Sequence, residues 1–255
     1  MKNLERVGDL SLVVRAYKTA RDSGLFDEIC ISSDCPSIIE EAESFGAKIH
    51  FIRPESLSLD TTLQAEVIKH ALDFFAARGV AFDNLTLLQP TSPFRTTHDL
   101  ISAHRLFESS RANTLISVQD VTRLDDSSTY FNNSSPGEKI LNLVPKSVAE
   151  SQVLGTLRQD FKNQYWRNGS IYIFRLTDNG IGKELLKAPI VGYLMGNLKS
   201  INIDSVEDLE RAYQRAAEDW VWLTRDEYEE IRRLSGCREG STHGAVIAAL
   251  AGRVK

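Results

Sequence analysis

Residues 87–95, with the sequence LLQPTSPFR, join a strand-like apolar start to side chains that could bind a polar ligand. Two leucines lead into a turn with two prolines, where Gln89, Ser92 and Arg95 supply an amide, a hydroxyl and a guanidinium. A strand that ends in such a turn places polar groups at the carboxyl edge of a parallel sheet, where open α/β folds bind their ligands. We therefore expect a ligand site at this turn.

Asp204 is a second position from which a side chain could reach this edge. It follows the strand-like residues 200–203 and precedes a helix-like segment that begins at Ser205. Its carboxylate would project over the ligand edge of the sheet, but it could equally cap the helix, a role for which Ser205 competes. The residues alone leave both roles open.

The elements that must position these side chains alternate between short β-branched segments and longer segments of helical periodicity. The expected helices cover residues 11–22, 36–46, 63–78, 97–108 and 205–219, and a last amphipathic helix begins near residue 224. The expected strands cover residues 28–33, 48–52, 85–88, 114–118, 170–174, 190–194 and 200–203. This alternation predicts an α/β fold with a doubly wound, mostly parallel sheet.

The domain organisation follows from length and from one interruption of the pattern. Residues 120–164 have the Asn, Ser, Pro and Gly content of an irregular excursion. The 255 residues can bury one sizeable core. We expect one α/β domain over residues 1–223 that includes the excursion, and a C-terminal helical extension and tail over residues 224–255.

Composition excludes several classes of protein. The chain is 42% hydrophobic and 25% charged, and its net charge of −5 comes from interspersed signs, so neither a nucleic-acid surface nor a polybasic membrane patch is expected. No apolar run approaches the ~20 residues that span a bilayer, and we expect a cytoplasmic protein. The three cysteines and five histidines show no zinc-ligand spacing.

Six segments occur in an order that resembles one enzyme family over about residues 2–217. They are KN at 2–3, SGLFDEICISSD at 23–34, IRPESLSLDT at 52–61, LLQPTSPFR at 87–95, RNGSIYIF at 167–174 and INIDSVEDL at 201–209. Together they resemble the acylneuraminate cytidylyltransferases, also called CMP-sialic acid synthetases. The resemblance implies a nucleotide-diphospho-sugar transferase-like fold and a reaction in which CTP and a nonulosonic acid, a nine-carbon α-keto sugar acid, give CMP-sugar and pyrophosphate.

The resemblance also implies the catalytic roles and the cofactor. Lys2 is implied at the α-phosphate of CTP, and Asp204 matches the family's metal-binding aspartate, with Mg²⁺ as the expected cofactor. The partner aspartate two residues earlier is Asn202 here. An amide oxygen can ligate Mg²⁺ but adds no negative charge, so we expect weaker metal binding or a metal that depends more on the CTP phosphates.

The resemblance further implies a set of substrate-binding residues. Arg158 stands ten residues before Asn168, as does the family's arginine near the sugar carboxylate, which a guanidinium can bind through two parallel hydrogen bonds. The complete set is Asn3, Arg53, Gln89, Ser92, Arg95, Arg158, Asn168, Gly169 and Tyr172. From the residues alone, Ser92 and Arg95 could instead hold the loop in shape, and Tyr172 could belong to the core.

The amino terminus departs from the family pattern. Family members begin with a buried strand and a glycine-rich phosphate loop, of which only the closing pair, Lys2 and Asn3, is matched here. The resemblance implies that the unmatched strand lies between residues 28–33 and 85–88, whose inner edges would lack partners. We therefore expect the true start to lie upstream.

Three functions remain open at this point. The expected one is a nucleotidyltransferase that activates a sialic-, legionaminic- or pseudaminic-type acid with CTP. The second is the related transfer to an eight-carbon keto-acid, and the third is a catalytically impaired homologue that binds a sugar acid or pairs with an intact subunit. A homodimer is implied because the family's counterpart of residues 120–164 reaches a second subunit.

Overall fold

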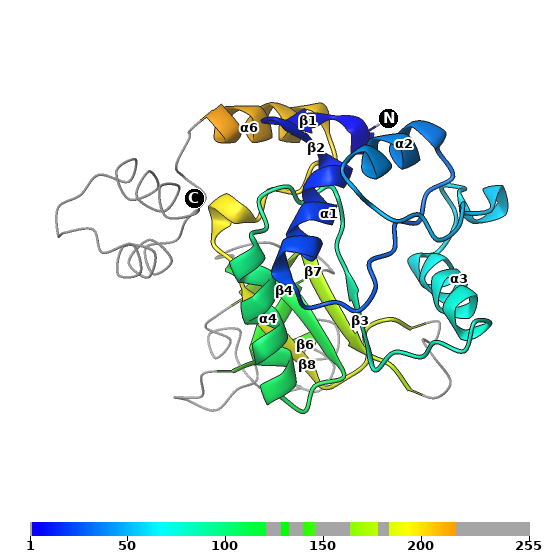
Figure 1. Ribbon diagram of the computed structural model, residues 1–255. Helices are drawn as coiled ribbons and strands as arrows, with labels where there is room; N and C mark the ends of the chain where they lie inside the picture. Colours follow the sequence, from blue (N-terminus) through cyan, green and yellow to red (C-terminus); the bar gives the residue numbers. More distant parts are fainter. Residues whose placement is uncertain (1, 121–128, 133–139, 146–163, 178–183, 218–255) are drawn as a thin grey trace, which may run out of the picture.

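A mixed six-stranded sheet lies at the centre of the computed structural model, which describes residues 2–120, 129–132, 140–145, 164–177 and 184–217 (Figure 1). The strand order is β3-β7-β4-β8-β6-β5. The strands are β3 (Asn84–Leu87), β4 (Thr114–Asp120), β5 (Thr129–Asn132), β6 (Leu141–Pro145), β7 (Gln164–Arg175) and β8 (Ile190–Leu194). A separate two-stranded ribbon joins β1 (Arg6–Val7) to β2 (Leu10–Ser11).

The helices begin and end at the residues that local chemistry favours. They are α1 (Leu12–Ser23), α2 (Pro36–Ser44), α3 (Gln64–Ala76), α4 (Thr97–Ser109) and α6 (Val206–Ala217), with 3-10 turns η1 (Lys2–Leu4), η2 (Glu55–Leu57) and η4 (Asn197–Lys199). Gly24 ends α1 in the left-handed region at φ +64°, where its N–H donates to the Arg21 carbonyl. Pro36 occupies the first turn of α2, where a missing N–H costs nothing.

The α/β class is confirmed, but the sheet is mixed rather than mostly parallel. Among the described strands, only β4 and β8 pair in parallel. β7 lies between β3 and β4 and runs antiparallel to both. The physical reason is that the path of the connecting chain sets the direction of a strand, whereas its own side chains report only burial.

Three expected strands are not strands in the structure. Residues 28–33, 48–52 and 200–203 form no ladder within the described chain, and β3 is paired there only with β7. Ile29 and Ile31 are nevertheless packed against Tyr17, Ala42 and Ala47. Apolar alternation therefore indicated the partial burial of Ile29 and Ile31, but a strand also needs a hydrogen-bonded neighbour.

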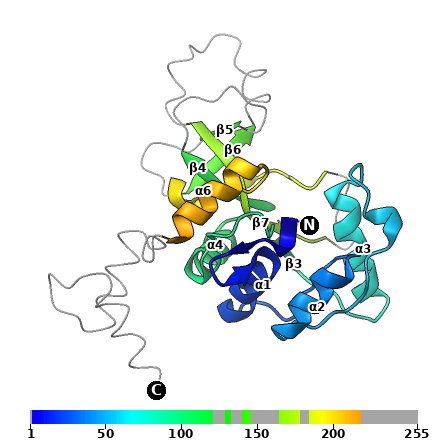
Figure 2. The ribbon, with the colours of Figure 1, turned by 90° about the horizontal axis from the view of Figure 1, so that it is seen from above.

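Part of the expected irregular excursion at residues 120–164 is regular. β5 and β6 pair with each other, β6 also pairs with β8, and β5 with β7. Figure 2 shows this end of the sheet projecting away from α1, α2 and α3. The expected boundary between residues 1–223 and 224–255 lies outside the described residues.

Two apolar clusters support the elements that carry the site. The larger one contains the buried Leu100, Ala103 and Phe107 of α4 and packs them on Leu115 of β4 and Ile173 of β7. The second contains Val7, Leu12, Phe94, Ile203 and Ala212. It joins β1, α1 and α6 beneath two loops whose polar residues are described below. Among the described helices, none is long and apolar enough to cross a membrane.

Candidate functional site

The loop between β3 and α4 is held in shape at both ends. The Ser92 N–H donates to the Gln89 carbonyl at 3.2 Å, which closes the turn. Phe94 is fully buried in the cluster beneath the loop. Thr96 then caps α4, because its Oγ1 accepts from the Asp99 N–H at 3.1 Å while Asp99 Oδ2 accepts from the Thr96 N–H at 2.8 Å.

Arg95 lies inside this loop with only 4% of its surface exposed. Its guanidinium donates to the Ser170 carbonyl of β7 and, at 3.4 Å, to the Gln89 carbonyl. Desolvation lowers the pKa of Arg95 to about 10, and the Asp99 carboxylate opposes this shift. This burial favours a supporting role for Arg95, which fixes the backbone of Gln89, over the predicted contact with substrate.

The segment after η4 carries Asn202 and Asp204 on the side opposite a buried anchor. Ile203 is 1% exposed, and its N–H donates to the Thr91 carbonyl at 2.8 Å. Because side chains alternate along extended backbone, the neighbours of Ile203 face outward. The Asn202 amide donates to Asp204 Oδ2, and the Ser92 hydroxyl donates to Asn202 Oδ1 at 3.4 Å.

Asp204 does not cap α6, so one of the two roles that the sequence left open for it is excluded. Ser205 Oγ accepts from the Asp208 N–H at 3.2 Å, and Asp208 Oδ2 accepts from the Ser205 N–H at 3.0 Å. Desolvation would raise the pKa of Asp208, but hydrogen bonds from Asp204 and Ser205 outweigh it and lower that pKa. The Asp204 side chain is 68% exposed, and Lys2 Nζ lies 3.2 Å from its Oδ1.

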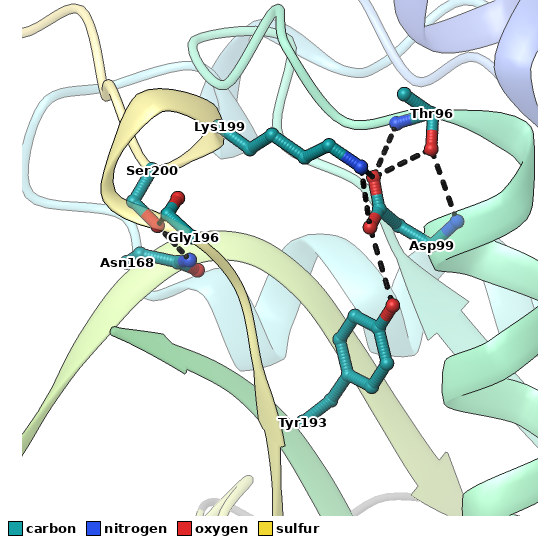
Figure 3. A network of polar contacts seen from close by, with 7 residues as sticks. All are labelled: Thr96, Asp99, Asn168, Tyr193, Gly196, Lys199 and Ser200. Atoms are coloured by element: carbon teal, nitrogen blue, oxygen red, sulfur yellow. Dashed lines mark hydrogen bonds and ion pairs between the residues drawn. The ribbon is translucent and has the colours of Figure 1, made fainter. Parts of the chain in front are cut away.

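Asn168 is used inside the protein. It is 2% exposed, and its Oδ1 accepts from Ser117 Oγ at 2.6 Å and from the Ser170 N–H at 3.1 Å. Its Nδ2 donates to Ser200 Oγ at 2.9 Å (Figure 3). The ladder between β4 and β7 shifts register here, between Ile116 and Val118. These bonds favour a role for Asn168 in aligning the site over the predicted direct contact with substrate.

Gly169 is the point at which two predicted site residues approach the backbone of β7. Its φ is +77°, and a Cβ at this position would lie 2.9 Å from Gln89 Oε1 and 3.8 Å from Asn202 Cγ. Only glycine tolerates both this conformation and this contact. The structure therefore brings Gln89, Gly169 and Asn202 together, with Ser92, Asp204 and Lys2 connected through Asn202.

A cavity of about 430 Å³ adjoins this cluster, and Gln89 belongs to both. Its apolar wall consists of Leu87, Phe174, Leu185 and Leu186, and its polar lining consists of Gln64, Gln89, Arg167, Tyr172 and Glu184. The rings of Tyr172 and Phe174 are stacked with centroids 6.2 Å apart. Desolvation raises the pKa of Tyr172, and the nearby Arg167 guanidinium opposes this. Tyr172 is thus a lining residue as well as a half-buried one.

Sequence reasoning missed Arg167 and Glu184 as cavity residues. Arg167 is the first residue of the RNGSIYIF motif and precedes Asn168, so the motif could have identified it as a site residue. Glu184 lies in a segment that no motif covers, and nothing in the sequence marked it.

The remaining predicted residues lie elsewhere or outside the described chain. Arg53 donates to Asp34 Oδ1 and to Ser58 Oγ, both at 2.9 Å, and its hydrogen bond is the main cause that lowers the pKa of Asp34. It therefore ties its own turn to residue 34. Asn3 lies next to Lys2 in η1. Arg158 lies outside the described residues, so its predicted contact with the sugar carboxylate stays a prediction.

The oxygens of Asp204 and Asn202 are the donors that fit the expected Mg²⁺. Within the described ranges, no group of three or more His, Cys, Asp or Glu residues is arranged to hold a metal ion. In this structure the Asn202 amide nitrogen faces Asp204 and its Oδ1 faces Ser92, so the amide oxygen would reach a cation at Asp204 only after the amide group turns over. One exposed carboxylate with one such amide oxygen suits a hard cation that receives most of its ligands from phosphates and water. The donor set therefore fits a metal that arrives with a nucleotide.

Comparisons with known proteins point to one family. A family model described as Cytidylyltransferase matches residues 1–238. The N-acylneuraminate cytidylyltransferase of Escherichia coli is 27% identical over 83% of this chain and 47% of its own length. The pseudaminic acid cytidylyltransferase of Campylobacter jejuni is 25% identical over 79% of this chain and 83% of its own length.

A solved structure extends the comparison to the fold. A CMP:2-keto-3-deoxy-manno-octonic acid synthetase in complex with CTP matches with a TM-score of 0.60, covering 86% of this chain and 92% of that one. At 12% identity, this likeness concerns the fold alone.

Proposed function

This chain belongs to the cytidylyltransferase family, and from that premise we propose that it transfers the cytidylyl group of CTP to a nonulosonic acid. The products are CMP-sugar and pyrophosphate. Relatives named for N-acylneuraminate and for pseudaminic acid support an acidic nine-carbon sugar as the acceptor. A further relative in Legionella pneumophila, named as a CMP-N,N'-diacetyllegionaminic acid synthase and 26% identical, supports the same class.

The observation that carries the proposal is the convergence of Gln89, Gly169, Asn202 and Asp204 beside a cavity. Gln89 lines the cavity, and Gly169 brings it close to Asn202. A volume of about 430 Å³ falls within the range of small-molecule sites. We place the sugar acid in the cavity and the triphosphate over Asp204.

The lining suits an acylated sugar acid. Leu185 and Leu186 offer an apolar wall to acyl or methyl groups, while Gln89 and Tyr172 can hydrogen-bond ring hydroxyls. Arg167 brings a cation to the same cavity. Arg158 keeps its predicted role at the sugar carboxylate.

The reaction is a displacement at the α-phosphorus of CTP. The anomeric hydroxyl oxygen of the sugar forms a new bond to that phosphorus, the bond to pyrophosphate breaks, and the hydroxyl proton is released. Lys2 would hold the α-phosphate oxygens, and Asp204 with Asn202 would hold Mg²⁺. The bound metal would neutralise charge on the triphosphate, so most of the catalysis is positioning and charge stabilisation.

The test is CTP-dependent pyrophosphate release with a panel of sugar acids. We expect turnover with a nine-carbon acid and little with an eight-carbon keto-acid, and a loss of at least about a hundredfold in Asp204→Ala. Asp73→Ala is the matched control, because Asp73 is an equally exposed carboxylate that also pairs with a lysine. Unchanged turnover in Asp204→Ala would refute the assignment of Asp204.

Catalysis is favoured over the impaired homologue because the relatives above are named as transferases and synthases. Calorimetry separates the two functions, since a binding protein would take up the sugar acid without processing CTP. We also propose a homodimer that works in the cytoplasm. Sedimentation of the full chain tests the oligomeric state.

A further inference from the structure

A buried ion pair joins the start of α4 to η4, the turn that precedes Asn202 and Asp204. Lys199 Nζ is 3.1 Å from both carboxylate oxygens of Asp99, and each side chain is 4% exposed (Figure 3). Asp99 lies in the first turn of α4, and Lys199 is the last residue of η4, a hundred residues further along the chain.

On one side, the pair is anchored to the loop that carries Gln89. Asp99 Oδ2 also accepts from the Thr96 N–H at 2.8 Å and from Thr96 Oγ1 at 2.6 Å. The Tyr193 hydroxyl donates to Asp99 Oδ1 at 3.2 Å. The Asp99 carboxylate therefore fixes the end of the loop at residues 89–96 and the start of α4 at once.

On the other side, the pair is anchored to the segment that carries Asn202 and Asp204. Ser200, the residue after Lys199, donates to the Gly196 carbonyl at 3.1 Å and accepts from the Asn168 amide at 2.9 Å. Only two residues separate Lys199 from Asn202. A shift of Lys199 would therefore also move residues 200–204, the metal-holding segment, which carries Asn202 and Asp204.

Stability alone is a weak explanation for this pair. Removing two charges from water is costly, and apolar residues of similar volume often replace a buried ion pair without loss of stability. Unlike an apolar contact, a charged pair with several hydrogen bonds fixes the orientation of two elements relative to each other. The place where a fixed orientation matters here is the cluster of Gln89, Asn202 and Asp204.

We propose that Lys199 and Asp99 are positioning residues. They set the distance between the loop at residues 89–96, which carries Gln89, and the metal-holding segment, which carries Asn202 and Asp204. This inference rests on the proposed function. Removing the pair should weaken binding of the metal–nucleotide complex by about tenfold to a hundredfold, the usual range when groups that orient metal ligands are lost.

The decisive variant is the double substitution Lys199→Met with Asp99→Asn. It removes both charges of the pair, so that neither Lys199 nor Asp99 is left without the other, and the Asn side chain can still accept from the Thr96 N–H. The buried Arg95 loses the nearby Asp99 carboxylate in this variant, so Asp99→Asn alone is measured beside it. Phe107→Leu is the control, because Phe107 is a buried α4 residue of the apolar core and is expected to lower stability without touching the pair. Lys199→Arg provides a conservative variant that keeps the positive charge but changes its geometry.

The probe is Mn²⁺ binding in the presence of CTP, followed by electron paramagnetic resonance on the full chain, together with the KM values for CTP and for the sugar acid. In the double variant we expect at least tenfold weaker Mn²⁺ binding and a raised KM for both substrates. Lys199→Arg should bind Mn²⁺ with an affinity between those of the double variant and the wild type, and Phe107→Leu should bind it as the wild type does. Mn²⁺ affinity within twofold of wild type in a folded double variant would overturn the inference. A wild type that binds CTP without binding Mn²⁺ would instead remove the metal role of Asp204 and Asn202, and this inference with it. A wild type that releases no pyrophosphate with any sugar acid would overturn the proposed function.

Discussion

Replacing Gly169 by alanine tests the arrangement of the site with a single methyl group. The new Cβ would lie 2.9 Å from Gln89 Oε1, a separation that carbon and oxygen do not maintain, so one of the two must move. The Gln89 side chain is flexible, whereas the β7 backbone is paired with β4 before and after Gly169, at Arg167 and at Tyr172. We expect Gln89 to rotate away from its place in the cavity.

The structure separates two consequences of this substitution. At φ +77°, an alanine costs about 1–2 kcal/mol of stability, or a loss of roughly 2–8 °C in Tm for a domain of this size. The lost hydrogen bond from Gln89 to a ring hydroxyl of the sugar acid costs about 0.5–1.5 kcal/mol, which is roughly a twofold to tenfold loss in kcat/KM for that substrate. The KM for CTP should stay within about twofold of wild type.

Gly79→Ala separates the loss of sugar binding from the loss of stability. Gly79 has φ +75°, nearly the same as Gly169, but nothing lies within 4 Å of the Cβ that would be added. Both variants should therefore lose similar stability by thermal melting, and only Gly169→Ala should raise the KM for the sugar acid. Equal kinetics in the two variants would refute the placement of Gln89 against the sugar.

Three further predictions concern single residues. Asn202→Asp adds a second carboxylate beside Asp204, so the Mg²⁺ concentration for half-maximal turnover should fall about tenfold; an unchanged value would remove Asn202 from the metal site. Lys2→Met should lower kcat/KM for CTP at least about tenfold while unfolding in urea changes by no more than about 1 kcal/mol, since the Lys2–Asp204 pair is exposed; wild-type kinetics would exclude Lys2 from the phosphate site. Burial raises the pKa of Cys30 to about 11, so at pH 8 only about a thousandth is thiolate and iodoacetamide should label it roughly a hundredfold more slowly than an ordinary thiol. Labelling as fast in the native chain as in urea would contradict that burial.

The helices could be predicted because the residues that start and stop them act locally. Gly24 ends α1 through its own positive φ, and Thr96 caps α4 through a residue three positions away. Sheet pairing is different, because it joins residues far apart. The sequence predicted a strand at residues 28–33, which are partly buried but not paired in the structure. Side-chain types indicate burial, but they do not show whether a partner strand lies beside the segment.

The sequence predicted those residues of the candidate site that belong to a recognised motif. Gln89, Gly169, Asn202 and Asp204 come from three separate motifs, and the structure places them together. The same motifs did not distinguish Asn202, whose side chain faces the site, from Asn168, whose amide is used up inside the protein. That distinction depends on Ser117 and Ser200, which reach Asn168 only through the tertiary fold.

The polar residues divide into an outer layer that can meet a ligand and an inner layer that holds it in place. Ser117, Asn168, Ser200, Asp99 and Lys199 are each at most 5% exposed and hydrogen-bonded to one another or to nearby backbone and polar groups. Buried polar groups bring less hydrophobic stabilisation than apolar ones and are costly whenever a partner is lost. A network of this kind in the elements that carry Gln89 and Asp204 is therefore better explained by the need to fix the outer side chains than by stability. It follows that substitutions in the inner layer should alter substrate and metal affinity more than their distance from the ligand suggests.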